Sequence, residues 1–202
     1  MYMMKKSELT RQQILDTAYD IFSTKGWDAT NLQDIADQLG ITRGPIYYYF
    51  KNKLELYNAV VEYSVGNYAL QSKACIEGSS PFCEMLECLL NTWLRLRQVS
   101  NLTNELVSKP ELAQQRTIYT NYCDEAYLLL TKRIRQEQEA GILRSHFPPE
   151  SLTEWIYVFF NGLLCMVKSP VKSQCKESPE EMIRYFVDIV RTVYAAGGNS
   201  EK

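Results

Sequence analysis

The residues best suited to chemistry lie close together, between positions 42 and 53. They read Thr-Arg-Gly-Pro at 42–45, Tyr-Tyr-Tyr at 47–49 and Lys at 53. An arginine has the forked donors that bind guanine O6 and N7, while hydroxyls and ammonium groups donate to phosphate oxygens. The preceding Thr-Asn pair adds donors at a helix N-terminus. The residues predicted to contact duplex DNA are Thr30, Asn31, Thr42, Arg43, Gly44, Pro45, Tyr47, Tyr48, Tyr49 and Lys53.

Two short helices are predicted to position these residues. Thr30 and Gln33 have the spacing of a capping box, which satisfies free N–H groups at a helix start. Gly40 ends that first helix, because glycine enters the left-handed conformation without a steric penalty. Thr42 caps the second helix, and Pro45 falls in its first turn, where a missing N–H costs nothing. The pattern is typical of a helix-turn-helix.

The second helix has an inner and an outer side. Ile46 and Phe50 are one turn apart and are expected to face the first helix, which leaves the Thr-Arg-Gly run and two tyrosines on the outside. An outward surface of this kind fits a recognition helix that enters the major groove. Arg43 is the residue expected to read a base edge, and Gly44 and Pro45 let the backbone approach the groove floor.

The segment ITRGPIYYYFKNK resembles the recognition-helix segment of TetR-family transcriptional repressors, and especially the drug-responsive branch that controls efflux, which shares the Thr-Arg-Gly run. The matching positions are Thr42, Arg43, Gly44, Ile46, Tyr47, Tyr48, Phe50 and Lys53. Tyr49 stands where the family usually has histidine, and a phenol cannot become cationic. The resemblance implies a dimeric repressor that binds an operator and is released by a small-molecule inducer.

Composition favours an all-α protein. The chain has 202 residues, 46% of them hydrophobic, with 7 proline and 9 glycine, and its net charge of −2 argues against a general binder of polyanions. We expect an N-terminal helix-turn-helix DNA-binding domain over 1–53 and a helical ligand-binding and dimerisation domain over 54–202, with 54–77 as a connecting helix. Beyond the helix-turn-helix, the caps and stops predict helices over 7–25, 53–77, 80–99, 103–108, 110–140, 149–168 and 178–196.

The last two predicted helices are apolar enough for a second buried face. A four-helix interface between two copies accounts for this, with Gly162 allowing close backbone approach. Ordinary core packing is the alternative. A two-fold dimer places two recognition helices roughly 34 Å apart and predicts a palindromic site. The residues assigned to the dimer interface are Ile156, Phe159, Phe160, Leu163, Ile183, Phe186, Val187 and Val190.

The middle helices carry aromatic residues, methionine and a few polar groups that suit a pocket for a small hydrophobic or aromatic effector. Each aromatic taken alone also suits ordinary core. The residues assigned to ligand binding are Phe82, Met85, Trp93, Glu105, Tyr119, Tyr122, Cys123 and Asn161.

The 6 cysteines are expected to be reduced thiols in a cytoplasmic protein. One alternative is a redox-sensing repressor that uses Cys83, Cys88 or Cys123, and another is an interaction protein with this fold that does not bind DNA specifically. No cofactor or metal site is expected. No enzyme is expected either, since no catalytic set is evident and the single histidine, His146, lies in a proline-flanked loop.

Overall fold

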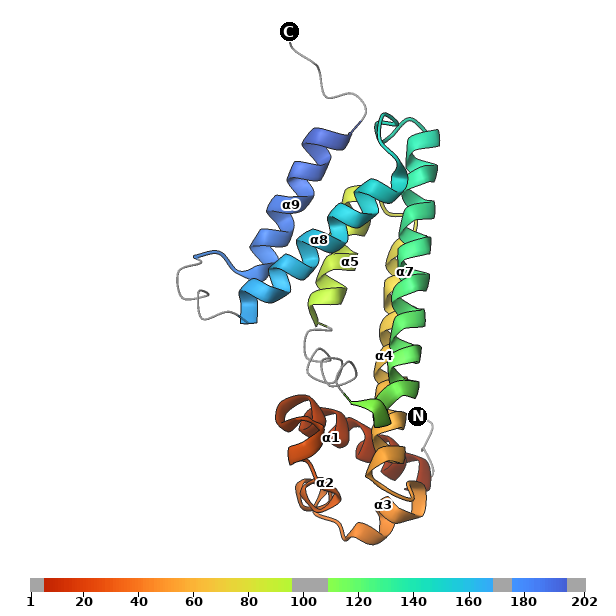
Figure 1. Cartoon of the computed structure of the whole chain (residues 1–202), viewed down its shortest axis with the longest axis vertical. Helices are drawn as coiled ribbons and strands as arrows, with labels where there is room; N and C mark the ends of the chain where they lie inside the picture. The colour runs from red at the N-terminus through yellow and green to blue at the C-terminus, as the bar shows by residue number, and fades with distance from the viewer. Residues whose placement is uncertain (1–5, 96–108, 169–175, 196–202) are drawn as a thin grey trace. The chain divides into compact units, whose positions relative to one another are not determined.

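The computed structural model describes residues 6–95, 109–168 and 176–195, and these residues are almost entirely helical (Figure 1). The elements are α1 (Lys6–Ala29), α2 (Leu32–Leu39), α3 (Arg43–Tyr49), α4 (Lys53–Glu77), α5 (Phe82–Arg95), a 3-10 turn η2 (Pro110–Leu112), α7 (Ala113–Glu139), α8 (Pro149–Lys168) and α9 (Pro179–Tyr194). The predicted all-α class is confirmed. The short helix expected over 103–108 lies outside the described residues, as does the predicted extension of α5 to residue 99.

The chain divides into two compact units, and two of the divisions fall inside helices, one in α4 and one in α7. The first unit contains residues 1–67 and 97–121, and the second contains residues 68–96 and 122–202. The boundary expected after residue 53 therefore does not coincide with this division, which places the first turns of α4 with the helix-turn-helix. Helix α4 contributes residues to both units and so joins them as one continuous helix, in the position where the sequence predicts a connecting helix.

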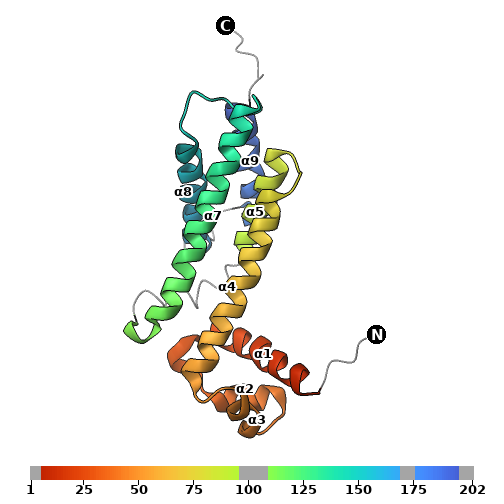
Figure 2. The same ribbon diagram turned by 90° about the vertical axis from the view of Figure 1, so that its right-hand side faces the viewer.

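In the first unit, α1 packs against α2 and α3, and Figure 2 shows the three gathered around the first turns of α4. The core side chains are buried completely or nearly so: Ile14, Ala18, Phe22, Ile35, Ile46, Phe50 and Tyr57. Trp27 packs edge-on against Tyr57, with ring centroids 4.9 Å apart. Burial of these rings and branched chains holds the two short helices, which are too short to be stable alone.

The helical backbone breaks at Gly26, as predicted, because Gly26 has φ 79° and ψ 175°, and a further turn runs from there to Ala29. A second local prediction at the α1–α2 junction is wrong. The N-cap of α2 is Asn31 rather than Thr30: the Asn31 side chain accepts from the Asp34 backbone N–H, and Asp34 accepts from the Asn31 backbone N–H. The kinked last turn of α1 places the Thr30 hydroxyl 2.7 Å from the Gly26 carbonyl, to which it donates.

In the second unit, α5 packs mainly against α9 around one apolar cluster. Its fully buried members include Leu86, Leu89, Leu130, Ile156 and Ile183, drawn from α5, α7, α8 and α9. Burying each such side chain stabilises the folded state by about 1.5–3 kcal/mol relative to leaving it in water. This cluster is the core that the apolar stripes of the C-terminal helices build.

Arg133 on α7 fixes the turn between α4 and α5. Its guanidinium donates to the carbonyls of Ile76 at 3.0 Å, Gly78 at 2.8 Å and Ser80 at 2.9 Å. The same side chain pairs with Glu137 at 2.6 Å. Carbonyls at a helix end have no intrahelical partner, so Arg133 acts as a side-chain cap for the end of α4.

The cysteine prediction needs one correction. Cys75 on α4 and Cys88 on α5 form a disulfide, with a Cα–Cα distance of 6.1 Å, where reduced thiols were expected. The two positions meet because α4 and α5 are joined by a short turn. Among the described cysteines, Cys83, Cys123 and Cys165 are not in disulfides.

No helix within the described ranges is both long enough and apolar enough to span a membrane.

Two capping boxes, Asn31–Asp34 at α2 and Ser178–Glu181 at α9, predict a loss of stability in acid. A backbone hydrogen bond from Asn31 lowers the pKa of Asp34, and one from Ser178 lowers the pKa of Glu181. A lowered native pKa stabilises the fold above the unfolded-state pKa, and that stabilisation is lost as pH falls through the native pKa. We therefore expect the melting temperature of the double variant Asp34→Asn, Glu181→Gln to depend less on pH than wild type below about pH 4. Thermal denaturation between about pH 2.5 and 6 measures this, and equal slopes would contradict it.

Candidate functional site

The turn between α2 and α3 is tight because Gly40 adopts the left-handed conformation, with φ 64°. The next amide, Ile41 N–H, donates back to the Ala36 carbonyl at 3.0 Å, which closes the end of α2. Thr42 then occupies the N-cap position of α3, although its side chain makes no cap hydrogen bond. This geometry is the helix-turn-helix that the sequence predicts.

Helix α3 separates an inner from an outer side, as the spacing of its residues predicts. Ile46 is completely buried, and Phe50 is 2% exposed. Tyr47 is 51% exposed and Tyr48 is 81% exposed. Thr42, Arg43 and Gly44 are exposed as well, while Pro45 and Tyr49 are half-buried. Large exposed aromatics next to an exposed arginine form a surface suited to a polar, anionic partner.

Arg43 is held from the preceding helix. Its Nε donates to the side-chain oxygen of Gln33 on α2. The Gln33 amide nitrogen in turn donates to Asp37 at 2.6 Å. Because this contact uses Nε, it leaves the two terminal nitrogens of the guanidinium, which are the pair suited to a bidentate contact with guanine. Gln33 is therefore a positioning residue that the motif alone did not reveal.

Three other residues predicted to contact DNA have side chains that already interact within the protein. Thr30 is 1% exposed and its hydroxyl donates to the Gly26 carbonyl, so a phosphate contact at this position is left to the backbone at the helix N-terminus. Asn31 is exposed, but its side chain caps α2. The ammonium nitrogen of Lys53 lies 4.4 Å from the centroid of the Trp27 ring, a cation–π distance.

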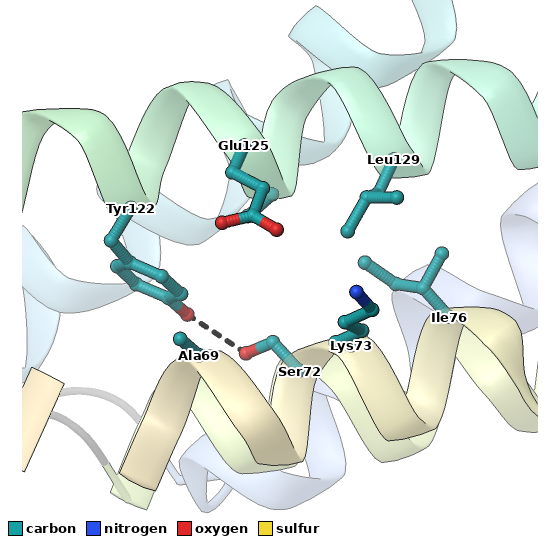
Figure 3. A pocket seen from close by; sticks show the side chains of 8 residues that line it. Ala69, Ser72, Lys73, Ile76, Tyr122, Glu125 and Leu129 are labelled. Carbon is teal, nitrogen blue, oxygen red and sulfur yellow. Dashed lines mark hydrogen bonds between the residues drawn. The ribbon is translucent and has the colours of Figure 1, made fainter. Parts of the chain in front are cut away.

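In the second unit, a polar cluster lies within an otherwise apolar region. The Ser72 and Tyr122 hydroxyls lie 2.8 Å apart, and Trp93 Nε1 donates to Ser72 at 3.2 Å. Figure 3 shows Tyr122 reaching from α7 toward Ser72 on α4 beside a small pocket. The pocket has room for about one water molecule and is lined by Ala69, Ser72, Lys73, Ile76, Tyr122, Glu125, Ala126 and Leu129. Burial raises the pKa of the Tyr122 phenol, which therefore stays neutral at physiological pH.

Aromatic rings extend this cluster toward α8. The Trp93 ring centroid lies 4.9 Å from that of Tyr157 and 5.3 Å from that of Phe160. The Tyr157 hydroxyl donates to the Cys123 carbonyl at 3.4 Å. The structure thus brings Trp93, Tyr122 and the Cys123 backbone into one neighbourhood.

Other predicted ligand residues lie elsewhere. Phe82 and Met85 are buried within the α5 core. Asn161 is exposed on α8, and its amide donates back to the Tyr157 carbonyl, so this side chain is not a pocket anchor. Tyr119 belongs to the first unit. Glu105 lies outside the described residues.

The predicted dimer residues also need correction. Six of the eight point into the core of their own chain: Ile156, Phe160, Leu163, Ile183, Val187 and Val190. Phe159 and Phe186 are half-buried and stack on one another with ring centroids 3.9 Å apart. The exposed apolar face of α8 and α9 instead consists of Trp155, Val158, Met166, Tyr185, Ile189 and Val193. Hydrophobic periodicity located the stripe that faces the chain's own core, and the exposed stripe was not predicted.

Within the described residues, no group of three or more histidine, cysteine or acidic side chains is placed to hold a metal ion.

A helix-turn-helix that exposes an arginine and two tyrosines on its second helix defines the class of DNA-binding transcriptional regulators. The family model described as bacterial regulatory proteins, tetR family, matches residues 14–60. That segment runs from α1 through α3 into α4. Residues 14–60 therefore match the DNA-binding segment of that family, and the chain is similar to regulators of its efflux branch.

Similarity to curated relatives extends beyond the matched segment. The HTH-type transcriptional regulator AcrR of Shigella flexneri is 28% identical over 169 residues, which cover 79% of this chain and 77% of that protein. The probable acrEF/envCD operon repressor of Escherichia coli is 47% identical over 49 residues, 24% of this chain and 22% of that protein.

The fold is shared with solved structures. A putative transcriptional regulator from Saccharomonospora viridis, crystallised in complex with choline, superposes with a TM-score of 0.76 at 21% identity. The match covers 93% of this chain and 98% of that chain. At this identity the likeness shows the fold alone. The relatives and structural neighbours are transcriptional regulators and not enzymes.

Sequence reasoning missed two residues that organise these sites. Ser72 continues the buried stripe of α4 seven residues after Val65, and a polar residue on such a stripe is a signal that can be read beforehand. Gln33 gave no such signal, because its contact with Arg43 depends on how α2 and α3 cross.

Proposed function

We propose that this chain is a homodimeric repressor that binds a palindromic operator through α3 and is released by a small hydrophobic or aromatic effector. The observation that carries the DNA-binding part is the exposed Arg43 supported by Gln33, beside the exposed Tyr47 and Tyr48. Arg43 reads a base edge, and the tyrosines contact phosphates and set the register. Such a protein works in the cytoplasm, where its DNA target lies.

The exposed face of α8 and α9 supports the dimer. Its residues recur at helical spacing on each helix, at 155, 158 and 166 and at 185, 189 and 193. Gly162 lies between them, and a Cβ added there would meet nothing within 4 Å, so the backbone is open to close approach by a partner. Pairing this face with its copy buries six large apolar side chains in each chain.

The polar cluster around Ser72 supports an effector site in the second unit. Rings from Trp93, Tyr122 and Tyr157 surround hydroxyl groups, a lining that suits an aromatic molecule with one hydrogen-bonding group. The pocket is closed to roughly one water molecule. An effector therefore binds by separating α4 from α7, and a hundredfold loss of operator affinity requires about 2.7 kcal/mol of differential binding.

Selection of duplexes from a random library with the purified protein tests the DNA-binding proposal. We expect an inverted repeat with half-site centres about one helical turn apart. Recovery of a single asymmetric half-site would contradict the dimeric arrangement. Recovery of no preferred sequence would favour the alternative of an interaction protein with this fold. A thermal-shift screen of aromatic compounds, followed by operator release, tests the effector.

A further inference from the structure

The Cys75–Cys88 disulfide joins the second half of α4 to the middle of α5. Its two sides differ in access to solvent. Cys75 is half-buried, with its sulfur 3.7 Å from the Thr92 hydroxyl, whereas Cys88 is exposed. A thiol at position 88 is thus reachable by a dissolved oxidant, and its partner is already within bonding geometry at a Cα–Cα distance of 6.1 Å.

We propose that Cys75 and Cys88 are a redox-active pair that hydroperoxides oxidise and low-molecular-weight thiols reduce. This rests on the proposed function, because a DNA-binding regulator works where glutathione and thioredoxin keep thiols reduced. Disulfides in that compartment are usually transient and redox-sensing rather than structural. The oxidation state of this pair would thus regulate the protein in addition to effector binding.

The chemistry balances with a hydroperoxide as the oxidant. The Cys88 thiolate attacks one peroxide oxygen, so that an S–O bond forms, the O–O bond breaks, and the other oxygen leaves as an alcohol, or as water from hydrogen peroxide, after taking a proton. The Cys75 thiolate then attacks the Cys88 sulfur, forming the S–S bond and releasing hydroxide, which is protonated to water. Two electrons pass from the thiols to the peroxide, and two equivalents of an external thiol reverse the change by exchange.

The pair lies one helical turn from the polar cluster. Ser72 and Cys75 are three residues apart on α4 and both face α5, where their partners are the neighbouring residues Trp93 and Thr92. A closed disulfide therefore fixes the spacing of α4 and α5 next to the hydroxyl of Ser72. Reduction leaves that spacing to weaker contacts, so the oxidation state sets how easily the second half of α4 moves.

Peptide mapping of the full chain tests the chemistry. The reduced protein is treated with one equivalent of hydrogen peroxide, quenched by alkylation and digested. We expect the peptides containing Cys75 and Cys88 to be recovered cross-linked in wild type. The matched controls Cys83→Ser, which changes a thiol on the same helix as Cys88, and Cys165→Ser, which removes an exposed thiol, should give the same cross-link. Cys75→Ser should give no cross-link. Pairing of Cys88 with another cysteine, or oxidation of Cys165 ahead of Cys88, would overturn the proposal.

Hydrogen exchange and operator binding test the consequence. We expect oxidation to slow exchange of the amides around 72–78 by about tenfold or more, in wild type and Cys83→Ser but not in Cys75→Ser. Affinity for the duplex selected by the reduced protein should differ between the two states by at least about fivefold. Equal exchange rates, or equal affinities, would overturn the regulatory role. If the reduced protein selects no duplex, the proposed function is contradicted instead. The hydrogen-exchange and peptide-mapping results then still test whether the cysteine pair is redox-active.

Discussion

The variant Ile189→Glu is expected to be monomeric and to lose about 10²–10⁴-fold in operator affinity. Ile189 is 57% exposed in the single chain, in the middle of the apolar face on α9. In a two-fold interface each substitution appears twice, so two carboxylates must be buried near one another at a cost of several kcal/mol. A monomer holds only one recognition helix, so it loses the gain that comes from binding the second half-site of the same duplex.

Leu70→Glu is the matched control for this variant. Leu70 is 68% exposed on α4, and it lies outside the apolar face of α8 and α9. We expect it to remain dimeric and to bind the operator as wild type does. Light scattering after gel filtration gives the mass of each variant, and thermal denaturation shows whether each one folds. A dimeric Ile189→Glu protein with unchanged operator affinity would place the interface elsewhere.

Local signals predicted most helix ends correctly. The bounds of α4, Lys53–Glu77, agree with the prediction, and α9 begins at Pro179, within one residue of the predicted start at 178. These signals reside in a few adjacent residues, so no tertiary information is needed to read them. The error at α2 has the same origin: Thr30 with Gln33 and Asn31 with Asp34 are both acceptable capping boxes, and only the kink at Gly26 decides between them.

Contacts between residues that are far apart in the sequence could not be predicted from the sequence alone. The eight predicted interface residues belong to real apolar stripes, but each helix has more than one apolar stripe, and the packing of α5 against α9 decides which is covered. The pairing of Cys75 with Cys88 likewise depends on the α4–α5 turn that Arg133 holds. Periodicity and caps are local properties, whereas these contacts depend on how helices cross.

Replacing Arg43 with alanine is expected to cost about 1–3 kcal/mol of operator binding, or roughly 5–150-fold in affinity. It should also relax the preference at one base pair in each half-site, because the lost side chain reads that base. The guanidinium is exposed and is held by Gln33, so the substitution leaves the buried side of α3 unchanged. Fluorescence anisotropy against duplexes with each base substituted in turn measures both effects.

Two further variants separate base readout from charge and from positioning. Lys53→Ala also removes a cation near the start of α4, and we expect it to weaken all duplexes alike and to lower the salt dependence by about one counterion. Gln33→Ala keeps the arginine but frees its Nε, so the preference at the same base pair should fall by less than in Arg43→Ala. If Arg43→Ala bound the selected operator as tightly as wild type, with the same base preferences, α3 would not read the sequence through Arg43. The exposed tyrosines of the same helix would then be the side chains left to account for specificity.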